Sequence, residues 1–209
     1  MFNPKDIIIK TLSHQYYSIL HQWLVPASIT IISLLLFANQ TAALELFEFN
    51  RQLISEGQYW RLLTGNFLHT NGWHLVLNIT GLLFLTLIFK QYCSVRAMIA
   101  FSLANSVAVG GLLYLFTPDI AYYVGLSGFL HGLFVVGCLA EISRGIKFSY
   151  LMLAVVTVKT IYEQMVGAPD NVRELIGANV AVDAHLYGAL TAVPMFASYW
   201  LYKKMLNRD

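Results

Sequence analysis

Six long apolar stretches alternate with short polar segments along the 209 residues of the chain. They cover residues 23–39, 73–89, 97–116, 122–141, 148–165 and 180–202. Each approaches the roughly 20 residues that an α-helix needs to cross the hydrocarbon core of a bilayer. The pattern therefore predicts an all-α membrane protein with a six-transmembrane-helix bundle over residues 23–202. An N-terminal segment, 1–22, would precede the bundle and a short tail, 203–209, would follow it.

The composition agrees with a membrane protein. Hydrophobic residues make up 57% of the chain and charged residues only 11%, whereas about a quarter of an ordinary soluble domain is charged. The formal net charge is +2, and the basic residues are scattered. We therefore expect the lipid bilayer as a partner, and no binding to nucleic acid.

The basic residues predict the orientation of the bundle. Nine of the thirteen Lys and Arg residues fall on one side of the predicted spans, three fall on the other, and Lys159 lies within the fifth span. The nine are Lys5, Lys10, Lys90, Arg96, Arg144, Lys147, Lys203, Lys204 and Arg208. Because cytoplasmic segments are enriched in Lys and Arg, both termini are predicted to be cytoplasmic.

The first external loop, residues 40–72, is long for a connection within a bundle. It mixes leucines and aromatic residues with Glu45, Glu48, Arg51 and Glu56. This amphipathic composition predicts short helices that lie in the membrane interface. Trp60 and Arg61 are expected to anchor the loop there.

Three polar residues are predicted to lie at one depth. Asn78, Ser127 and His185 each fall five residues into the second, fourth and sixth spans, which all run inward from the outer face. Each would lie roughly 7–8 Å below the outer end of its helix. His74 is one turn above Asn78 on the same helical face. Since polar groups at membrane depth are costly, we expect these side chains to be functional.

Their chemistry is that of acyl transfer. Ser127 and His185 form a minimal nucleophile and general base. Asn78 and His74 could donate hydrogen bonds to the oxyanion that develops on the attacked carbonyl. Each residue also has a structural alternative. The Ser127 hydroxyl could bond to a carbonyl of its own helix. Asn78 could form a hydrogen bond between helices that only supports packing.

The residues around Ser127 form the sequence Val124–Gly132, VGLSGFLHG. Gly125 and Gly128 permit an open helix start, where the backbone N–H of Ser127 could join the oxyanion donors. His131 lies four residues after Ser127, on the same helix face. It could orient or stack on His185, or it could serve packing alone.

These motifs together resemble the rhomboid family of intramembrane serine proteases. They are GLSG at 125–128, His74-x-x-x-Asn78, AHLYGALTA at 184–192 and the pair Trp60-Arg61. The resemblance implies a Ser127–His185 catalytic dyad with His74 and Asn78 as oxyanion donors, acting without a cofactor. It also implies that Gly188 and Ala192 let the sixth helix pack against the fourth.

One departure points to a branch of that family. Where many rhomboids carry a tyrosine four residues after the serine, this chain has His131, and GLSGFLHG is similar to the rhombosortase branch. That resemblance implies a bacterial inner-membrane protease whose active site opens to the periplasm. The implied substrates are membrane-anchored proteins with a C-terminal Gly-Gly-type motif, an apolar span and basic residues, which are destined for the cell surface.

A metal site and an aspartate triad are disfavoured by the sequence. Zinc could bind His74, His131 and His185, but the H-E-x-x-H motif is absent and no carboxylate is suitably spaced, so no metal is expected. Asp183 lies about 200° around the helix from His185, which disfavours an aspartate triad. Lys159 and Glu163 are expected to pair near the outer end of the fifth span.

Two further function classes remain as alternatives to a protease. A catalytically silent rhomboid-like protein could bind membrane segments as a quality-control adaptor, although such proteins typically lack the serine or the histidine. A small transporter would favour internal repeats, and the sequence contains none.

Overall fold

The computed structural model describes the backbone of residues 4–92 and 94–206. Its long helices are α1 (Pro4–Ala38), α5 (Gly72–Phe89), α6 (Val95–Phe116), α7 (Ser127–Ile142), α8 (Phe148–Val166) and α10 (Val182–Leu206). Short elements connect them: α2 (Gln40–Phe47), β1 (Phe49–Asn50), α3 (Arg51–Ser55), α4 (Arg61–Thr64), η1 (Gly65–Phe67), η2 (Lys90–Tyr92), β2 (Tyr122–Tyr123) and α9 (Asp170–Ile176).

The all-α class is confirmed, with a two-residue antiparallel strand pair as the exception in the described chain. Each predicted apolar stretch overlaps one of the long helices. Within the described residues, His21–Ala38, Gly72–Phe89 and Val95–Phe116 are long and apolar enough to cross a membrane. A fourth crossing is added if α8 and α9, which bend by 87° at their junction, are counted together.

One predicted boundary is wrong, and another stays a prediction. α1 begins at Pro4 and runs without a break past residue 23, with Pro26 inside the helix, so the helix itself does not mark where a cytoplasmic segment 1–22 would end. The fourth span was predicted from residue 122, but α7 begins at Ser127. Gly125 adopts φ +134°, a conformation that no α-helix contains, and Tyr122 and Tyr123 pair with β1 instead.

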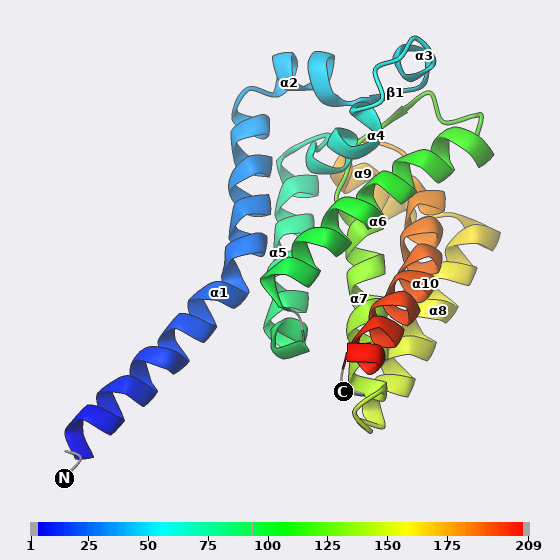
Figure 1. The fold of residues 1–209 in the computed structure, drawn as a ribbon. Helices are drawn as coiled ribbons and strands as arrows, with labels where there is room; N and C mark the ends of the chain where they lie inside the picture. The colour runs from blue at the N-terminus through cyan, green and yellow to red at the C-terminus, as the bar shows by residue number, and fades with distance from the viewer. Residues whose placement is uncertain (1–3, 93, 207–209) are drawn as a thin grey trace.

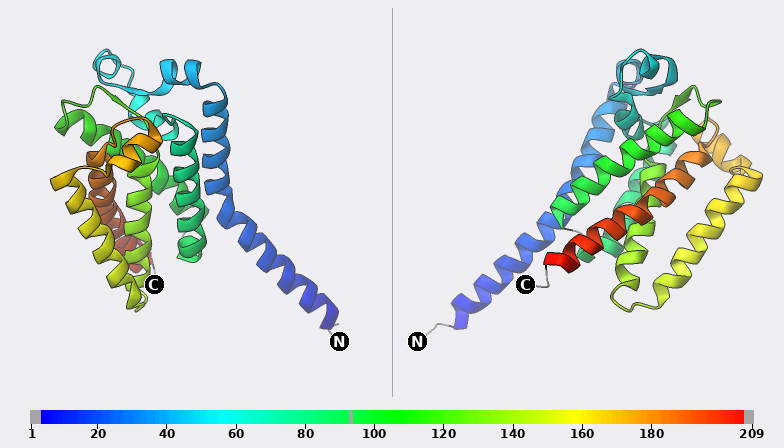
Figure 2. Two further views of the ribbon diagram at one scale, coloured as in Figure 1. Left: turned by 180° about the vertical axis from the view of Figure 1, so that it is seen from behind. Right: turned by 45° about the vertical axis from the view of Figure 1, so that its right-hand side comes forward.

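The helices bring the short elements together at one end of the molecule. α2, α3, α4 and α9 gather at the upper end in Figure 1, whereas α1 begins and α10 ends at the lower end. α7 packs against α5, α8 and α10, and the second view in Figure 2 shows α8 on the outside of this group. The largest cluster of buried apolar side chains joins α1, α5, α6 and α7, including Leu82, Phe89 and Phe129.

The connection between α1 and α5 is held by buried hydrogen bonds. Arg61 was expected at the membrane interface, but it is only 3% exposed. Its guanidinium donates to the carbonyl oxygens of Glu45 (2.7 Å) and Glu48 (2.9 Å) and to Oε1 of Gln58 (2.7 Å). A buried cation requires such partners. Two of them here are backbone carbonyls near the end of α2, where carbonyl groups lack N–H partners within the helix. Arg61 therefore ties the loop together.

α7 and α10 approach each other through glycine. A methyl group on Gly188 would overlap the backbone carbonyl of Gly128, and one on Gly128 would lie 2.9 Å from the carbonyl oxygen of Ala184. Asn105 of α6 secures the same point by donating to the carbonyl oxygen of Gly188 (3.0 Å). Ala192, one turn further along α10, is fully buried. Small residues at this contact thus set the spacing of the two helices.

Replacing Gly188 with Ala should separate α7 from α10. Overpacking of this kind costs about 1–3 kcal/mol, and here the overlap is with backbone that cannot rotate away. We expect a lower thermal midpoint and less folded protein in detergent. Gly111→Ala is the matched control, because that α6 glycine has open space around it and should be neutral or slightly stabilising. Equal midpoints for both variants would contradict the assigned contact.

Candidate functional site

Ser127 and His185 meet at the contact between α7 and α10. Ser127 is the first residue of α7, and His185 lies in the first turn of α10. Oγ of Ser127 is 3.0 Å from Nε2 of His185, a hydrogen-bonding distance. His185 is only 5% exposed. The apolar pattern predicts Ser127 five residues into its helix, whereas Ser127 begins α7. The two side chains nevertheless meet, since the helices cross where Gly128 and Gly188 touch.

A cavity of about 370 Å³ lies over Ser127, at the end of the molecule that carries the short helices. Ser127 and His74 line it together with residues of α2, β2 and the segment that follows α9. The other lining residues are Leu44, Glu48, Thr70, Tyr122, Tyr123, Val124, Ile176, Ala178, Asn179, Val180 and Ala181. An extended peptide could therefore reach the serine from this end.

Asn78 carries a hydrogen-bond donor with no partner. Its side chain is 5% exposed, and its Nδ2 has no hydrogen-bond partner among the described residues. An unsatisfied buried donor costs about 1–3 kcal/mol. Such a group in a well-packed protein calls for an explanation, and a donor reserved for a bound group is one.

His74 lies beside the backbone that leads into α7. A methyl group on Gly125 would lie 2.9 Å from its Nε2, so that position requires glycine both for space and for its φ. Nδ1 of His74 lies 3.0 Å from Oγ1 of Thr70, which itself donates to the carbonyl oxygen of Ile176, and 3.4 Å from the backbone N of Thr70. In the contact with Thr70 Oγ1, Nδ1 donates and therefore carries the ring proton. In the longer contact with the Thr70 backbone N–H, Nδ1 accepts, and only then does the neutral ring carry its proton on Nε2.

His131 stacks on His185. The ring centroids are 4.1 Å apart and the planes differ by 15°. Nδ1 of His131 lies 2.7 Å from the carbonyl oxygen of Ser127. Of the two readings left open for His131, the structure therefore shows the stacked arrangement, with the ring tied to the backbone of the serine.

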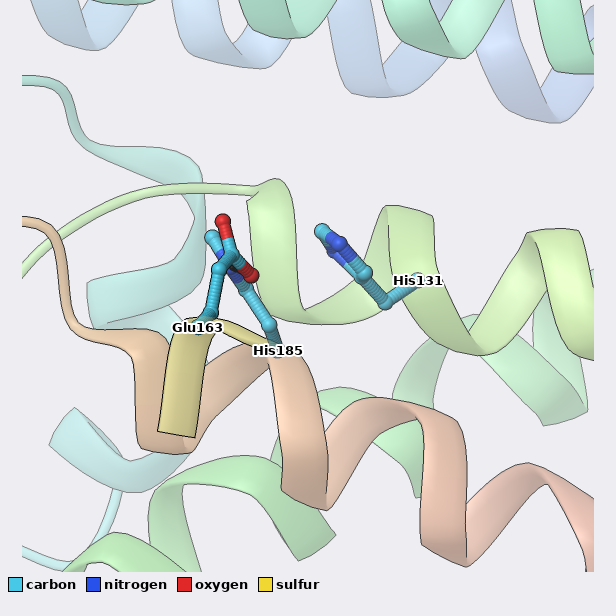
Figure 3. Close-up of side chains that lie close together, drawn as sticks. All are labelled: His131, Glu163 and His185. Carbon is cyan, nitrogen blue, oxygen red and sulfur yellow. Dashed lines mark hydrogen bonds and ion pairs between the residues drawn. The ribbon is translucent and has the colours of Figure 1, made fainter. Parts of the chain in front are cut away.

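A carboxylate contacts the far side of His185. Oε2 of Glu163, on α8, lies 2.9 Å from Nδ1 of His185 and 2.8 Å from Nζ of Lys159. In Figure 3, Glu163 of α8 and His185 overlap in the view, and His131 of α7 lies to their right. The predicted pairing of Lys159 with Glu163 is present. The contact between Glu163 and His185 was not predicted from the sequence. Two charged residues inside an apolar span could have indicated it, because charges at that depth usually pair with other polar groups.

The expectation that no carboxylate is suitably placed for a metal site needs correction. One ligand atom from each of His131, Glu163 and His185 lies within 4.8 Å of the others. However, Lys159 donates to Oε2 of Glu163, and its Nζ lies 2.7 Å from Nε2 of His131. The ammonium group thus already occupies the position between two of these ligands, and a metal ion does not fit this arrangement. His74 is not part of the cluster.

Two titratable groups border the site outside the long helices. Burial, and then the neighbouring His74, lower the pKa of His69 to about 3, and the two rings meet edge-on with centroids 5.1 Å apart. Burial raises the pKa of Glu48, which lines the cavity, and the Arg61 guanidinium opposes that effect. A neutral imidazole beside His74 adds no charge next to the site.

The shift of His69 makes stability depend on pH. An ordinary histidine has a pKa near 6.5, so between pH 6.5 and about 3 the unfolded chain binds a proton that the folded chain does not. Stability is complete above this window and falls as the pH drops into it, by about 2 kcal/mol at pH 5. We expect the thermal midpoint of His69→Met to fall less between pH 7 and pH 5 than that of the wild type. Identical pH profiles would show that His69 is not the group responsible.

Comparison with known protein families gives a direct result. Residues 56–202 match the rhomboid domain, which is most of the chain and includes the predicted site residues from His74 to His185. No curated protein matches the sequence. Members of this family are, in general, intramembrane serine proteases. With its apolar helices and this match over residues 56–202, the chain is a membrane protein that belongs to the rhomboid family.

Proposed function

We propose that the protein is an intramembrane serine endopeptidase that uses Ser127 as nucleophile and His185 as general base. The observation that carries the proposal is the 3.0 Å contact between Ser127 Oγ and His185 Nε2 beneath the cavity. Both groups come from long apolar helices, so the bond to be cut must enter a protein interior at membrane depth.

The reaction follows from this geometry. Ser127 Oγ attacks the scissile carbonyl while Nε2 of His185 takes its proton. The same proton then passes to the amine of the leaving group. The amine departs, and the acyl group stays bound to Ser127 as an acyl-enzyme. Water enters from the cavity, gives its proton to His185 and attacks the ester, and the proton returns to Ser127 as the acid product departs.

The oxyanion would be stabilised by donors that start without partners. Asn78 Nδ2 is such a donor, and the N–H of Ser127 lies in the first turn of α7, where helix N–H groups lack intrahelical acceptors. His74 joins them in the tautomer or charge state that protonates Nε2. Gly125 and Gly128 support the site by allowing the turn into α7 and the approach of α10.

We also propose how the protein lies in the membrane. All six long helices would cross it, with residues 23–202 as the membrane domain and the flanking segments 1–22 and 203–209 in the cytoplasm. The basic residues support this orientation, and so does the fact that α1 begins and α10 ends at the same end of the bundle. The cavity over Ser127 would then open to the periplasm of a bacterial inner membrane. The loop formed by α2, α3 and α4 would rest at the outer interface.

The substrates we propose are single-span membrane proteins with a C-terminal apolar tail, cut near the outer face. This rests on the similarity of GLSGFLHG to the rhombosortase branch and on His131 in place of tyrosine. The alternative is a silent membrane-segment binding protein, which would have no use for the contact between Ser127 and His185.

Ser127→Ala and His185→Ala should each abolish cleavage of a tail-anchored reporter that carries a Gly-Gly-type motif. Both variants should still accumulate in the membrane, since neither side chain makes the contact between Gly128 and Gly188. A fluorophosphonate should label the wild type at Ser127 alone, as mapped by peptide mass, and should fail to label His185→Ala. Cleavage by Ser127→Ala at the wild-type rate would show that Ser127 is not the nucleophile. A wild-type protein that neither cleaves the reporter nor is labelled would leave the silent binding protein as the better explanation.

Asn78→Ala should lower kcat by on the order of 10²- to 10³-fold, as loss of an oxyanion donor does. Stability should hold or rise, because the variant removes a buried donor for which the described residues provide no partner. Kinetics of reporter cleavage and a thermal melt of the same sample test both parts. A large loss of stability with unchanged kcat would assign Asn78 to packing instead.

A further inference from the structure

The structure points to a third member of the catalytic unit. This inference rests on the proposed function. We propose that Glu163 holds His185 in the orientation needed to accept the serine proton, and that Lys159 supplies the counter-charge for Glu163. Both residues come from α8, so the unit Ser127–His185–Glu163 joins three helices. In this unit Glu163 acts through His185, as a positioning residue.

The proton positions follow from the contacts. His185 can act as a base only if Nε2 offers its lone pair to the Ser127 hydroxyl, which leaves the ring proton on Nδ1. Nδ1 lies 2.9 Å from Oε2 of Glu163, and an ionised carboxylate only accepts hydrogen bonds. The contact with Glu163 therefore selects the tautomer that the reaction requires.

Lys159 explains how a carboxylate persists at this depth. The Glu163 side chain is 7% exposed, and a lone buried charge is unfavourable. Lys159 Nζ donates to the same oxygen at 2.8 Å, while its own side chain is 44% exposed and keeps contact with the surroundings. The pair is therefore close to neutral, and only one of its members is buried inside the protein.

The same ammonium connects the pair to His131. Nζ of Lys159 has only protons to offer, so Nε2 of His131, 2.7 Å away, must accept. The remaining ring proton of His131 then lies on Nδ1 and is donated to the carbonyl oxygen of Ser127 at 2.7 Å. A closed circuit results, Ser127–His185–Glu163–Lys159–His131–Ser127, in which one assignment of protons satisfies each contact.

This circuit acts on the reaction in two ways. When His185 takes the serine proton it becomes a cation between Glu163 and the stacked ring of His131, and the carboxylate lowers the free energy of that state. The ring is also held from both sides, by the contact at Nδ1 and by the 4.1 Å stack, so it need not be oriented during each turnover.

A purely structural role for Glu163 is the competing explanation, in which it only fastens α8 to α10. The chain offers a matched control for it. Glu141, near the other end of α7, is also buried and accepts a hydrogen bond from Ser149 of α8. Glu141→Gln therefore makes the same chemical change between two packed helices, about 20 Å along α7 from Ser127.

The experiment compares Glu163→Gln with Glu141→Gln in full-length protein reconstituted into vesicles. Glu163→Gln should lower both kcat and the rate of fluorophosphonate labelling at Ser127 by about 10²-fold or more, with KM within about twofold. Glu163→Asp should recover part of the loss, and Lys159→Met should reduce kcat by about tenfold. Glu141→Gln should leave kcat, KM and labelling unchanged.

Two outcomes would overturn the proposal about Glu163 alone. In one, Glu163→Gln keeps wild-type kcat and labelling while Ser127→Ala is inactive. In the other, Glu163→Gln changes only the thermal midpoint, as Glu141→Gln would if both were structural. Failure of the proposed function is distinct, because wild-type cleavage would then persist in Ser127→Ala and Ser127 would resist labelling.

Discussion

The close approach of α7 and α10 is the constraint on which the rest of the structure depends. Gly128 and Gly188 bring two backbones into contact, and a side chain on either residue would push them apart. Ser127 directly precedes one glycine, and His185 lies one turn before the other. The distance between the hydroxyl and the imidazole is therefore set by helix packing. Because helices are rigid, the geometry needs no flexible loop to maintain it.

A second requirement is that charge inside the bundle be compensated. Glu163, Lys159 and the two stacked rings use one another's hydrogen-bonding capacity, so a strongly polar cluster can persist between apolar helices. Asn78 is the contrasting case, since its donor has no partner in the part of the chain that the structure describes. The cluster around His185 thus closes on its own hydrogen bonds, while the proposed oxyanion donor Asn78 keeps an Nδ2 group that none of the described residues uses.

The helices and most of the candidate site residues could be predicted, because a chain that crosses a membrane can adopt few backbone structures. Backbone groups in lipid must be satisfied within their own segment, so long apolar stretches become helices, and polar residues inside them stand out. Ser127, His185 and the pair Lys159 and Glu163 were visible on that basis. The start of α7 was placed five residues too early, because periodicity does not register the backbone of Gly125. Arg61 was placed at the interface, because its buried carbonyl partners lie up to 16 residues away along the chain.

The sequence by itself determined the helical class, the residues available for chemistry and the glycine pattern that permits close packing. It could not reveal that the carboxylate beside His185 comes from α8, 22 residues earlier, while Asp183, two residues away, points elsewhere on its helix. Spacing along one helix reports which side chains share a face. Which faces meet is decided by the packing of all the helices at once, and only the tertiary structure contains that information.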